Sequence, residues 1–389
     1  MSIVVQKYGG SSVADVEKIG AVADKVVATK KRGHDVVVVV SAMGKTTDEL
    51  IALAKKVSKD PPRRELDMLV TTGERVSMAL LAIAIQSRGC EAISFTGSQS
   101  GIITNDRHFD ARIIEVRPHR IEDELARGTV VIVAGYQGMS YKREITTLGR
   151  GGSDTTAVAL AAALGAERCE IYSDVDGVYS ADPRVVSDAE HLPEIDLAML
   201  QEMAESGAKV LNAQAVEWAR RQKIAIYARK TADPTPPPKE TIAREDAQAR
   251  VRAVVGMDRV VVVSFAENDA PHVLAALGEL DVPFVDATSR TAAVPLLNLP
   301  DWERRRAALE SRVAGRATLE EGFAIASVVG DGLAGAVGRF LAALGEHGCE
   351  PRTLSAGPLR IAAAVPAAKL GDVQRALHAA FVASRPPSR

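Results

Sequence analysis

The chain has 389 residues, of which 48 are basic and 50 are acidic, and this near balance gives no sign of a nucleic-acid-binding surface. Its three cysteines, Cys90, Cys169 and Cys349, form no CxxC pair, which argues against a disulfide framework or a cysteine-ligated metal. No signal-peptide pattern and no uncharged apolar run of about 20 residues is present, so we expect a cytoplasmic protein without a membrane partner.

Short β-branched runs alternate with longer amphipathic stretches through the first half of the chain. The expected strands are 3–5, 36–40, 92–95, 130–134 and 170–173, and the expected helices are 13–31, 47–57, 64–88 and 153–164. The five consecutive valines at 36–40 are typical of a parallel strand that is covered on both faces. This order predicts an α/β fold with a mainly parallel sheet.

The pattern changes at residues 231–248, where four prolines fall within 234–238 and predict a linker. A β-α-β order follows at 251–265, 271–278 and 282–286. A β-α-β-β-α order then follows at 323–329, 333–347, 351–355, 359–365 and 373–381. The second order is that of a small ferredoxin-like module, and the pair is a candidate for a diverged internal repeat.

Two glycine-rich turns lie between a strand and a helix, where backbone amides and the helix dipole can hold an anion. Residues 7–12 read KYGGSS, and Lys7 adds a mobile positive charge, although such a turn is as often only a tight connection. Residues 146–156 read TTLGRGGSDTT. Helix capping explains Ser153 and Asp154 but not three glycines around Arg150, whose guanidinium suits a carboxylate. Neither turn matches the Walker A pattern.

Three further polar segments carry candidate functional groups. Residues 41–49 follow the valine strand, at the end of the strand where open α/β sheets bind ligands. Glu74, taken alone, is more simply a solvated helix charge than a ligand for an amine. Residues 173–184 open with an Asp-x-Asp-Gly pattern, but Val185 stands where a calcium loop needs glutamate, so a loop over a nucleotide is the better interpretation.

Together, five ordered motifs at 7–12, 41–50, 72–75, 147–156 and 172–184 resemble the aspartokinases, especially the actinobacterial ones. The resemblance runs nearly continuously from residue 5 to about residue 211. It implies an amino-acid kinase domain, an αβα sandwich, at 1–230, then the linker at 231–248. Two small ferredoxin-like (ACT-like) α+β modules are implied at 249–318 and 319–389.

The implied reaction is phosphorylation of the β-carboxylate of L-aspartate by ATP with Mg²⁺, giving 4-phospho-L-aspartate. This would be the first step toward aspartate semialdehyde and products such as lysine, threonine and methionine. The resemblance also implies a homodimer or higher homo-oligomer that assembles through the ACT-like modules.

The resemblance assigns roles to individual residues. Lys7 and Lys209 would neutralise the transferring phosphoryl group, and Asp154 would orient both lysines. Arg150 would hold the α-carboxylate of aspartate, and Glu74 would face its α-amine. The remaining residues of the aspartate pocket would be Ser41, Thr47, Gly151, Gly152 and Ser153.

The ATP site implied by the resemblance has twelve members. They are Lys7, Tyr8, Gly9, Gly10, Ser173, Asp174, Tyr179, Ser180, Asp182, Pro183, Arg184 and Lys209. We expect no protein metal ligand, because Mg²⁺ can be held largely by the nucleotide phosphates.

The C-terminal modules depart from the family pattern. The effector loops of the family resemble Asp-x-Pro-Gly and Ser-His-Pro-Gly-Val, whereas this chain has ENDAPH at 267–272 and GDGLAGA at 330–336. At 288–290 Thr-Ser-Arg replaces the usual Gln-Asn, and at 354–359 LSAGPL replaces the usual Ser-Thr-Ser-Glu-Ile. We therefore expect the modules to remain as a dimer-forming platform without feedback control by lysine or threonine.

Two other functions compete with this one. A kinase of the same fold could act on another acidic amino acid in a specialised pathway. An inactive kinase could serve as a sensor, although the presence of Lys7, Asp154 and Lys209 argues against it. Met257 could be an internal start for a separate regulatory subunit, but a core residue beside the valines at 260–263 is the simpler interpretation.

Overall fold

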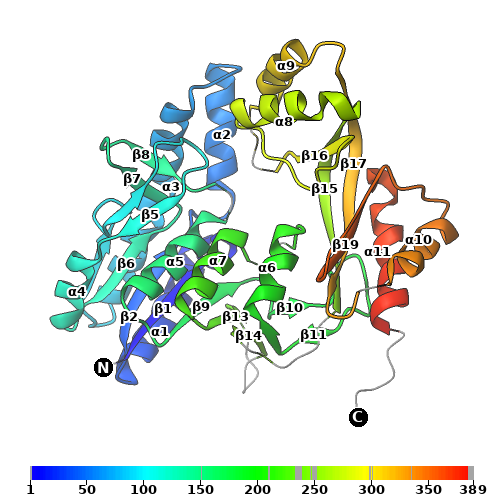
Figure 1. The fold of residues 1–389 in the computed structure, drawn as a ribbon. Helices are drawn as coiled ribbons and strands as arrows, with labels where there is room; N and C mark the ends of the chain where they lie inside the picture. The colour runs from blue at the N-terminus through cyan, green and yellow to red at the C-terminus, as the bar shows by residue number, and fades with distance from the viewer. Residues whose placement is uncertain are drawn as a thin grey trace. The chain divides into compact units, whose positions relative to one another are not determined.

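The computed structural model describes residues 2–149, 151–208, 211–232, 239–245, 247, 252–297, 299, 301–333 and 335–383. The chain forms two units. The first comprises Met1–Val178, Pro193–Leu200 and Val210–Gln248, and the second comprises Tyr179–Leu192, Gln201–Lys209 and Ala249–Arg389. Two segments within the range 1–230 thus belong to the second unit (Figure 1).

The first unit is built on an eight-stranded sheet with the order β12-β14-β13-β9-β1-β2-β6-β3. Its strands are β1 (Ile3–Tyr8), β2 (Asp35–Val40), β3 (Ala92–Phe95), β6 (Val130–Ala134), β9 (Arg168–Ser173), β12 (Glu194–Asp196), β13 (Ile226–Lys230) and β14 (Glu240–Arg244). Every neighbouring pair is parallel except β13 with β14. The predicted mainly parallel α/β fold is therefore confirmed.

The prediction of a linker at 231–248 is partly wrong, because β14 lies within that range and pairs with β13 in this sheet. Burial alternates along the β14 sequence Glu-Thr-Ile-Ala-Arg, with Thr241 and Ala243 buried, but polar and apolar residues do not alternate. Without that alternation to indicate a strand, the neighbouring prolines decided the prediction. Residues 233–238, which carry those prolines, lie outside the described residues.

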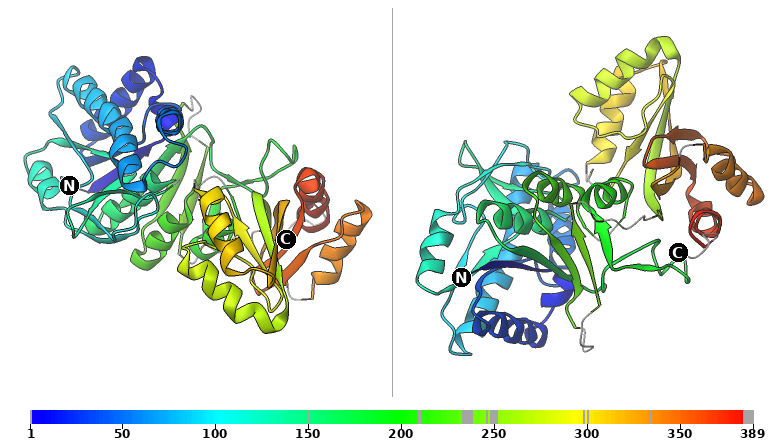
Figure 2. Two further views of the ribbon diagram at one scale, coloured as in Figure 1. Left: turned by 90° about the horizontal axis from the view of Figure 1, so that it is seen from above. Right: turned by 60° about the horizontal axis from the view of Figure 1, so that its bottom comes forward.

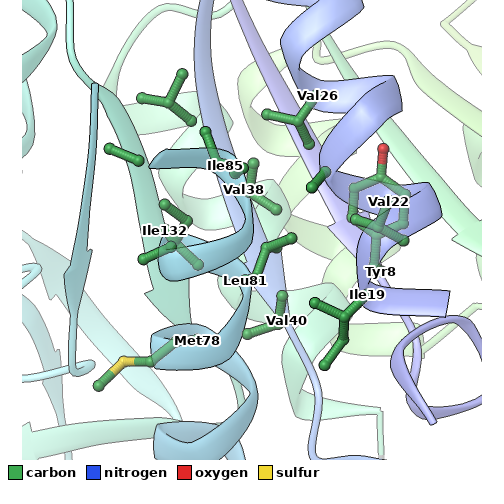
Figure 3. Packing of buried hydrophobic residues seen from close by; sticks show 14 of the residues in the cluster. Tyr8, Ile19, Val22, Val26, Val38, Val40, Met78, Leu81, Ile85 and Ile132 are labelled. Atoms are coloured by element: carbon green, nitrogen blue, oxygen red, sulfur yellow. The ribbon is translucent and has the colours of Figure 1, made fainter. Parts of the chain in front are cut away.

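Helices cover both faces of the sheet, as expected for an αβα sandwich. They are α1 (Val16–Lys31), α2 (Thr46–Val57), α3 (Arg63–Gln86), α4 (His119–Ala126), α5 (Gly152–Ala163) and α7 (Ala213–Gln222), while α6 (Leu197–Glu205) runs from the first unit into the second. On one face, α1 and α3 pack against alternate residues of β1, β2 and β6, including Val38, Val40 and Ile132 (Figure 3). Helix α5 packs against β1, β2 and β9.

Helix α3 is long and apolar enough to cross a membrane by length and composition alone. Its residues Leu81 and Ile85 are instead fully buried against the sheet (Figure 3). The same helix carries two buried carboxylates, Asp67 and Glu74. Both observations identify α3 as a core helix of the first unit.

A second, four-stranded sheet in the first unit has the order β5-β4-β7-β8. Its strands are β4 (Ile102–Thr104), β5 (Ile113–Val116), β7 (Gln137–Ser140) and β8 (Ile145–Thr147). The sequence did not predict it, because strands of three or four residues leave little periodicity to detect. Strand β8 ends directly before the second glycine-rich turn.

The second unit has a five-stranded antiparallel sheet with the order β16-β15-β17-β19-β18. Its strands are β15 (Arg252–Phe265), β16 (Thr291–Pro295), β17 (Ala317–Gly330), β18 (Thr353–Ala356) and β19 (Arg360–Pro366), and its helices are α8 (Ala270–Glu279), α9 (Trp302–Arg312), α10 (Val337–Glu346) and α11 (Leu370–His378). A separate pair joins β10 (Val178–Tyr179) to β11 (His191–Leu192). Shorter helical segments in the chain are Gly10–Val13, Glu267–Asp269, Ala367–Lys369 and Ala379–Ala383.

The two expected modules share strands. In β15, Val261 and Val263 pack with α8 and α9, whereas Val254 packs with α10 and α11. Strand β17 is divided in the same way, with Leu319 at one core and Val328 at the other. Both strands extend from the yellow helices to the orange and red helices (Figure 2). The modules are therefore halves of one sheet.

The secondary structure of the first module was partly mispredicted. Residues 282–286 form no strand beyond one bridge between Val285 and Ala293, and β16 occupies the edge instead. Pro283 lacks the N–H that a ladder needs, and Asp286 has a φ of 50°. Helix α9 was not predicted. Met257 is partly buried and packs against the cluster around Val260, as a core residue would.

Replacing Leu81 with Ala should destabilise the first unit by about 3 kcal/mol, because this fully buried side chain fills the space between α3 and the sheet. Ile83 on the same helix is 61% exposed, and its replacement should cost less than about 0.5 kcal/mol. The chain has two tryptophans, and Trp218 lies in α7. Urea unfolding of a Trp302→Phe background, followed by Trp218 fluorescence, measures both effects. Equal losses for the two variants would contradict the packing described.

Candidate active site

Loops that follow four parallel strands meet at one edge of the large sheet. The amide of Ser41, after β2, donates to the carbonyl of Tyr8 at 3.1 Å. The amide of Gly9, after β1, donates to the carbonyl of Tyr172 in β9 at 3.1 Å, and that of Gly135, after β6, donates to Val40 at 2.9 Å. The carboxyl ends of β1, β2, β6 and β9 therefore form a single edge, the usual ligand-binding position of open α/β sheets.

A buried ion pair lies at this edge. The Nζ atom of Lys7 in β1 is 2.7 Å from Oδ1 of Asp154 in the first turn of α5, and the two side chains are only 11% and 9% exposed. Asp154 also suits the positive end of the α5 dipole. The carboxylate thus holds the ammonium group in one place, largely out of bulk water. The structure brings together these two residues, which the resemblance implies for the catalytic centre.

The backbone of the first glycine-rich turn packs directly against the backbone of the loop after β2. The amide of Gly44 donates to the carbonyl of Gly10 at 3.0 Å. A Cβ atom on Gly10 would lie only 2.8 Å from the carbonyl oxygen of Ala42. A side chain on Gly9 would stand 3.4 Å from Nζ of Lys7. Glycine at position 10 therefore allows this close approach of the two backbones.

The second glycine-rich turn needs glycine for a different reason. Gly149 and Gly151 have φ values of 75° and 76°, in the left-handed region that L side chains rarely adopt. Gly152 begins α5, and a Cβ atom on this residue would lie only 2.6 Å from Cβ of Leu148. Gly151 is the N-cap residue, so Ser153 does not cap the helix as simple capping would require. Ser153 is buried, and its Oγ lies against Gly135.

Glu74 is not a solvated helix charge, because it is only 2% exposed. Its Oε1 accepts a hydrogen bond from the amide of Ala42 at 3.1 Å, which joins α3 to the loop after β2. Its Oε2 has no hydrogen-bond partner among the described residues. Burial raises the pKa of this carboxyl to about 7. A buried carboxylate with one open oxygen is suited to accept hydrogen bonds from an ammonium group.

The other residues expected at the aspartate site are only partly covered by the described residues. The carbonyl of Ser41 accepts a hydrogen bond from the Ser77 hydroxyl at 2.7 Å. Thr47 is half-buried in the first turn of α2. Arg150 and Lys209 lie outside the described residues, so their positions stay predictions.

The residues expected at the ATP site fall in both units. In the first unit, Ser173 ends β9 and Asp174 is exposed directly after it. The Tyr8 ring is fully buried and stacks on Tyr172 at 4.8 Å, so only its backbone faces the sheet edge. Lys7, Gly9 and Gly10 also belong to the first unit, whereas Tyr179, Ser180, Asp182, Pro183 and Arg184 belong to the second.

Within the second unit, side-chain contacts hold the segment 179–184 in place. Ser180 is buried, and its Oγ is 2.9 Å from Nε2 of His378 in the last turn of α11. Asp182 and Arg184 form an ion pair at 2.8 Å. The Ser180 hydroxyl is therefore engaged inside this unit, and its expected place at the ATP site stays a prediction.

Several buried polar residues near the site were missed from the sequence. Asp67 and Ser77 lie on the same face of α3 as Glu74, and Thr147 ends β8. The seven-residue spacing of Asp67 and Glu74 was the available signal, since it places both carboxylates on one helical face. Among the described residues, no three His, Cys, Asp or Glu side chains gather to hold a metal ion.

Comparisons with known proteins agree on the kind of molecule. The model of the amino acid kinase family matches residues 2–229. The chain is 43% identical to the aspartokinase of Mycolicibacterium smegmatis and 41% identical to that of Corynebacterium glutamicum, in each case over 98% of this chain and 96% of the relative. Its structure is similar to E. coli aspartokinase III in complex with aspartate and ADP, with a TM-score of 0.83, 25% identity and coverage of 97% and 99% of the two chains.

The pKa of Glu74 predicts an unusual pH dependence of stability. Its pKa of about 7 in the folded state exceeds the usual 4.5, so keeping this group buried becomes more costly as pH rises between these values. Replacing Glu74 with Gln should therefore stabilise the protein by a margin that grows from pH 5 to pH 8 and approaches about 3 kcal/mol. Thermal unfolding of both proteins across this range measures the margin.

Glu170 is a matched control with the opposite sign. It is also buried, but Arg229, Arg168 and Gln6 outweigh the effect of burial and lower its pKa. Its contribution to stability is already present above the usual pKa of a glutamate, so Glu170→Gln should destabilise the protein by a constant amount from pH 5 to pH 8. A pH-independent margin for Glu74→Gln would contradict the assignment of its pKa.

Proposed function

The chain belongs to the amino acid kinase family as one of its aspartokinases, and we propose that it transfers the γ-phosphoryl group of ATP to the β-carboxylate of L-aspartate. The observation that carries this proposal is the buried Lys7–Asp154 pair at the sheet edge where Glu74 also has an open carboxylate oxygen. The ammonium of Lys7 suits a phosphate, and the open carboxylate oxygen of Glu74 suits an ammonium group. ATP-dependent phosphorylation of an amino acid uses both.

The chemistry needs little from the protein beyond position and charge. The β-carboxylate of aspartate is ionised at neutral pH and is itself the nucleophile, so no general base is needed. A carboxylate oxygen bonds to the γ-phosphorus, the bond from that phosphorus to the β,γ-bridging oxygen breaks, and ADP leaves. Lys7 would offset the negative charge on the transferring group, while Asp154 keeps its ammonium in place. Lys209 is the expected second cation.

The aspartate substrate would be held at both ends. The open oxygen of Glu74 would accept a hydrogen bond from the α-amine, and Arg150 would bind the α-carboxylate. Ser41, Thr47, Gly151, Gly152 and Ser153 would complete the pocket. The first glycine-rich turn, Ser173 and Asp174 would face ATP, and the Mg²⁺ would arrive with the phosphates of the nucleotide.

The product, 4-phospho-L-aspartate, is an acyl phosphate and must be consumed by a reductive or group-transfer step. We propose that it feeds aspartate semialdehyde and amino acids such as lysine, threonine and methionine in the cytoplasm. We also propose that the second unit forms a homo-oligomer without responding to lysine or threonine. Two of its diverged segments contact each other, since Arg290 is 3.4 Å from Glu267.

Turnover with a panel of acceptors tests the proposed substrate. L-Aspartate should support ATP-dependent ADP release, whereas L-glutamate should be too long and succinate should lack the amine that Glu74 binds. A coupled assay of ADP release measures each. A preference for another acidic amino acid would replace aspartate in the proposal, and ADP release with no acceptor at all would contradict the proposal.

Replacing Lys7 with Ala should lower kcat by about 10²–10³-fold, because the loss removes a charge that acts mainly in the transition state. Lys18 is a matched control, since it is exposed and its ammonium lies 3.7 Å from Asp15, the N-cap residue of α1. Lys18→Ala should leave kcat unchanged. Near-normal kcat in Lys7→Ala would remove this residue from the catalytic centre.

Lysine and threonine, singly and together at millimolar concentration, should change the rate by less than about twofold, whereas allosteric coupling usually changes affinity by about 5–150-fold. The reason is the loss of the polar groups that the effector loops of the family carry. Initial rates at subsaturating aspartate measure the effect. Strong inhibition at submillimolar effector would show that the modules still respond.

A further inference from the structure

Helix α3 carries a row of buried polar side chains along one face. Asp67, Thr71, Glu74 and Ser77 are spaced by four, three and three residues, and each is at most 2% exposed. Glu74 and Ser77 bind the loop after β2 through the amide of Ala42 and the carbonyl of Ser41. One end of the row therefore fixes one wall of the candidate aspartate site.

Asp67 lies two turns away and is fully buried. Its carboxylate accepts hydrogen bonds from three donors on two other segments. These are Nδ1 of His108 at 2.7 Å, the amide of Phe109 at 3.1 Å and the hydroxyl of Thr147 at 2.6 Å. Burial raises the pKa of Asp67, although these bonds act against the shift. Several donors around one buried carboxylate form a stiff connection.

The two segments that Asp67 binds both lead to the second glycine-rich turn. Thr147 is separated from Gly149 by a single residue, and its carbonyl also accepts from the amide of Ala111 at 2.8 Å. On the other side, the position of a Cβ on Gly149 is 3.2 Å from Asp110 and 3.6 Å from the carbonyl of Phe109. Gly149 is thus braced by both segments.

The backbone at Phe109 shows that this bracing is needed. Phe109 has a φ of 71°, which is unfavourable for a bulky L residue and persists only where the surroundings enforce it. Its amide donates to the carboxylate of Asp67, and the residue is only 9% exposed. The hydrogen bond from α3 therefore helps to hold a strained segment next to Gly149.

We propose that Asp67 is a positioning residue that sets the second glycine-rich turn, through Thr147 and Phe109, at a fixed place relative to the loop of Ser41 and Ala42. One rigid helix then spaces the two walls of the acidic-substrate site. Asp67 touches neither substrate, and its effect is on affinity for the amino acid rather than for ATP. This inference rests on the proposed function.

Substitutions at Thr147 test the connection with little change of shape. Thr147→Val removes the hydroxyl that Asp67 accepts, and Thr147→Ser retains it. In Thr147→Val and Asp67→Asn we expect kcat/KM for aspartate to fall by about 10–100-fold, the scale of a small misplacement at a reacting site. The KM for ATP should stay unchanged, and Thr147→Ser should behave as the unmodified chain.

Thr71→Val is the matched control on the same helix face. The Thr71 hydroxyl donates to the carbonyl of Met68 within α3, so its loss leaves both loops in place. Its kcat/KM for aspartate should not change. If Asp67→Asn fails to fold, the Thr147 pair carries the test. A folded Thr147→Val with unchanged kinetics, or equal losses for aspartate and ATP, would overturn the proposal.

Hydrogen exchange gives a readout that does not depend on turnover. In Thr147→Val, amides at 148–153 should exchange faster than in Thr147→Ser, while those at 42–46 should not change. Unchanged exchange at 148–153 would overturn the positioning role. Absence of aspartate turnover in the unmodified chain would instead overturn the proposed function, and the exchange measurement would still decide the role of Asp67.

Discussion

The ammonium group of Lys7 and the carboxylate of Asp154 meet at 2.7 Å where β1 ends and α5 begins. This contact depends on the parallel pairing of β1 with β2 and β9, because only parallel strands deliver their carboxyl ends to one edge. Valine-rich strands stabilise that arrangement by burial on both faces. The core of the first unit and its candidate active site therefore have the same physical cause.

Helix α3 connects the hydrophobic core of the first unit to its candidate active site. Its apolar face packs Leu81 and Ile85 against the sheet, and its polar face binds the loops at the sheet edge. A helix held by the core is a rigid support, and side chains that it binds inherit its position. Glu74 and Asp67 would otherwise be costly to bury, so their hydrogen bonds are part of the explanation for their presence in the core.

Much of the fold was predictable from local patterns. The valine run at 36–40 became β2, and the glycine-rich segments were recognised as candidate anion sites, whereas the pairing of Lys7 with Asp154 was implied only by the resemblance. The short strands β4, β5, β7 and β8 were missed because their pairing is set by tertiary contacts. The burial of Glu74 was also missed, because a helical glutamate has no local feature that reports the loop packed over it.

The C-terminal half shows a second limit of local patterns. Strands β15 and β17 were expected to belong to different modules, yet each contributes to both hydrophobic cores. A repeat read along the chain cannot show that one long strand serves two cores, since the division depends on which helices pack at each end. The segment that contains Ser180 is likewise ordered by His378, almost 200 residues later in the chain.

Hydroxylamine trapping of the product is the most direct test of the central claim that this site phosphorylates the β-carboxylate of aspartate. A reaction with ATP, Mg²⁺, L-aspartate and hydroxylamine should yield β-aspartyl hydroxamate in proportion to the ADP released, as identified by mass spectrometry against α and β standards. The Lys7→Ala variant should yield almost none. ADP release without hydroxamate, or formation of the α isomer, would contradict the account.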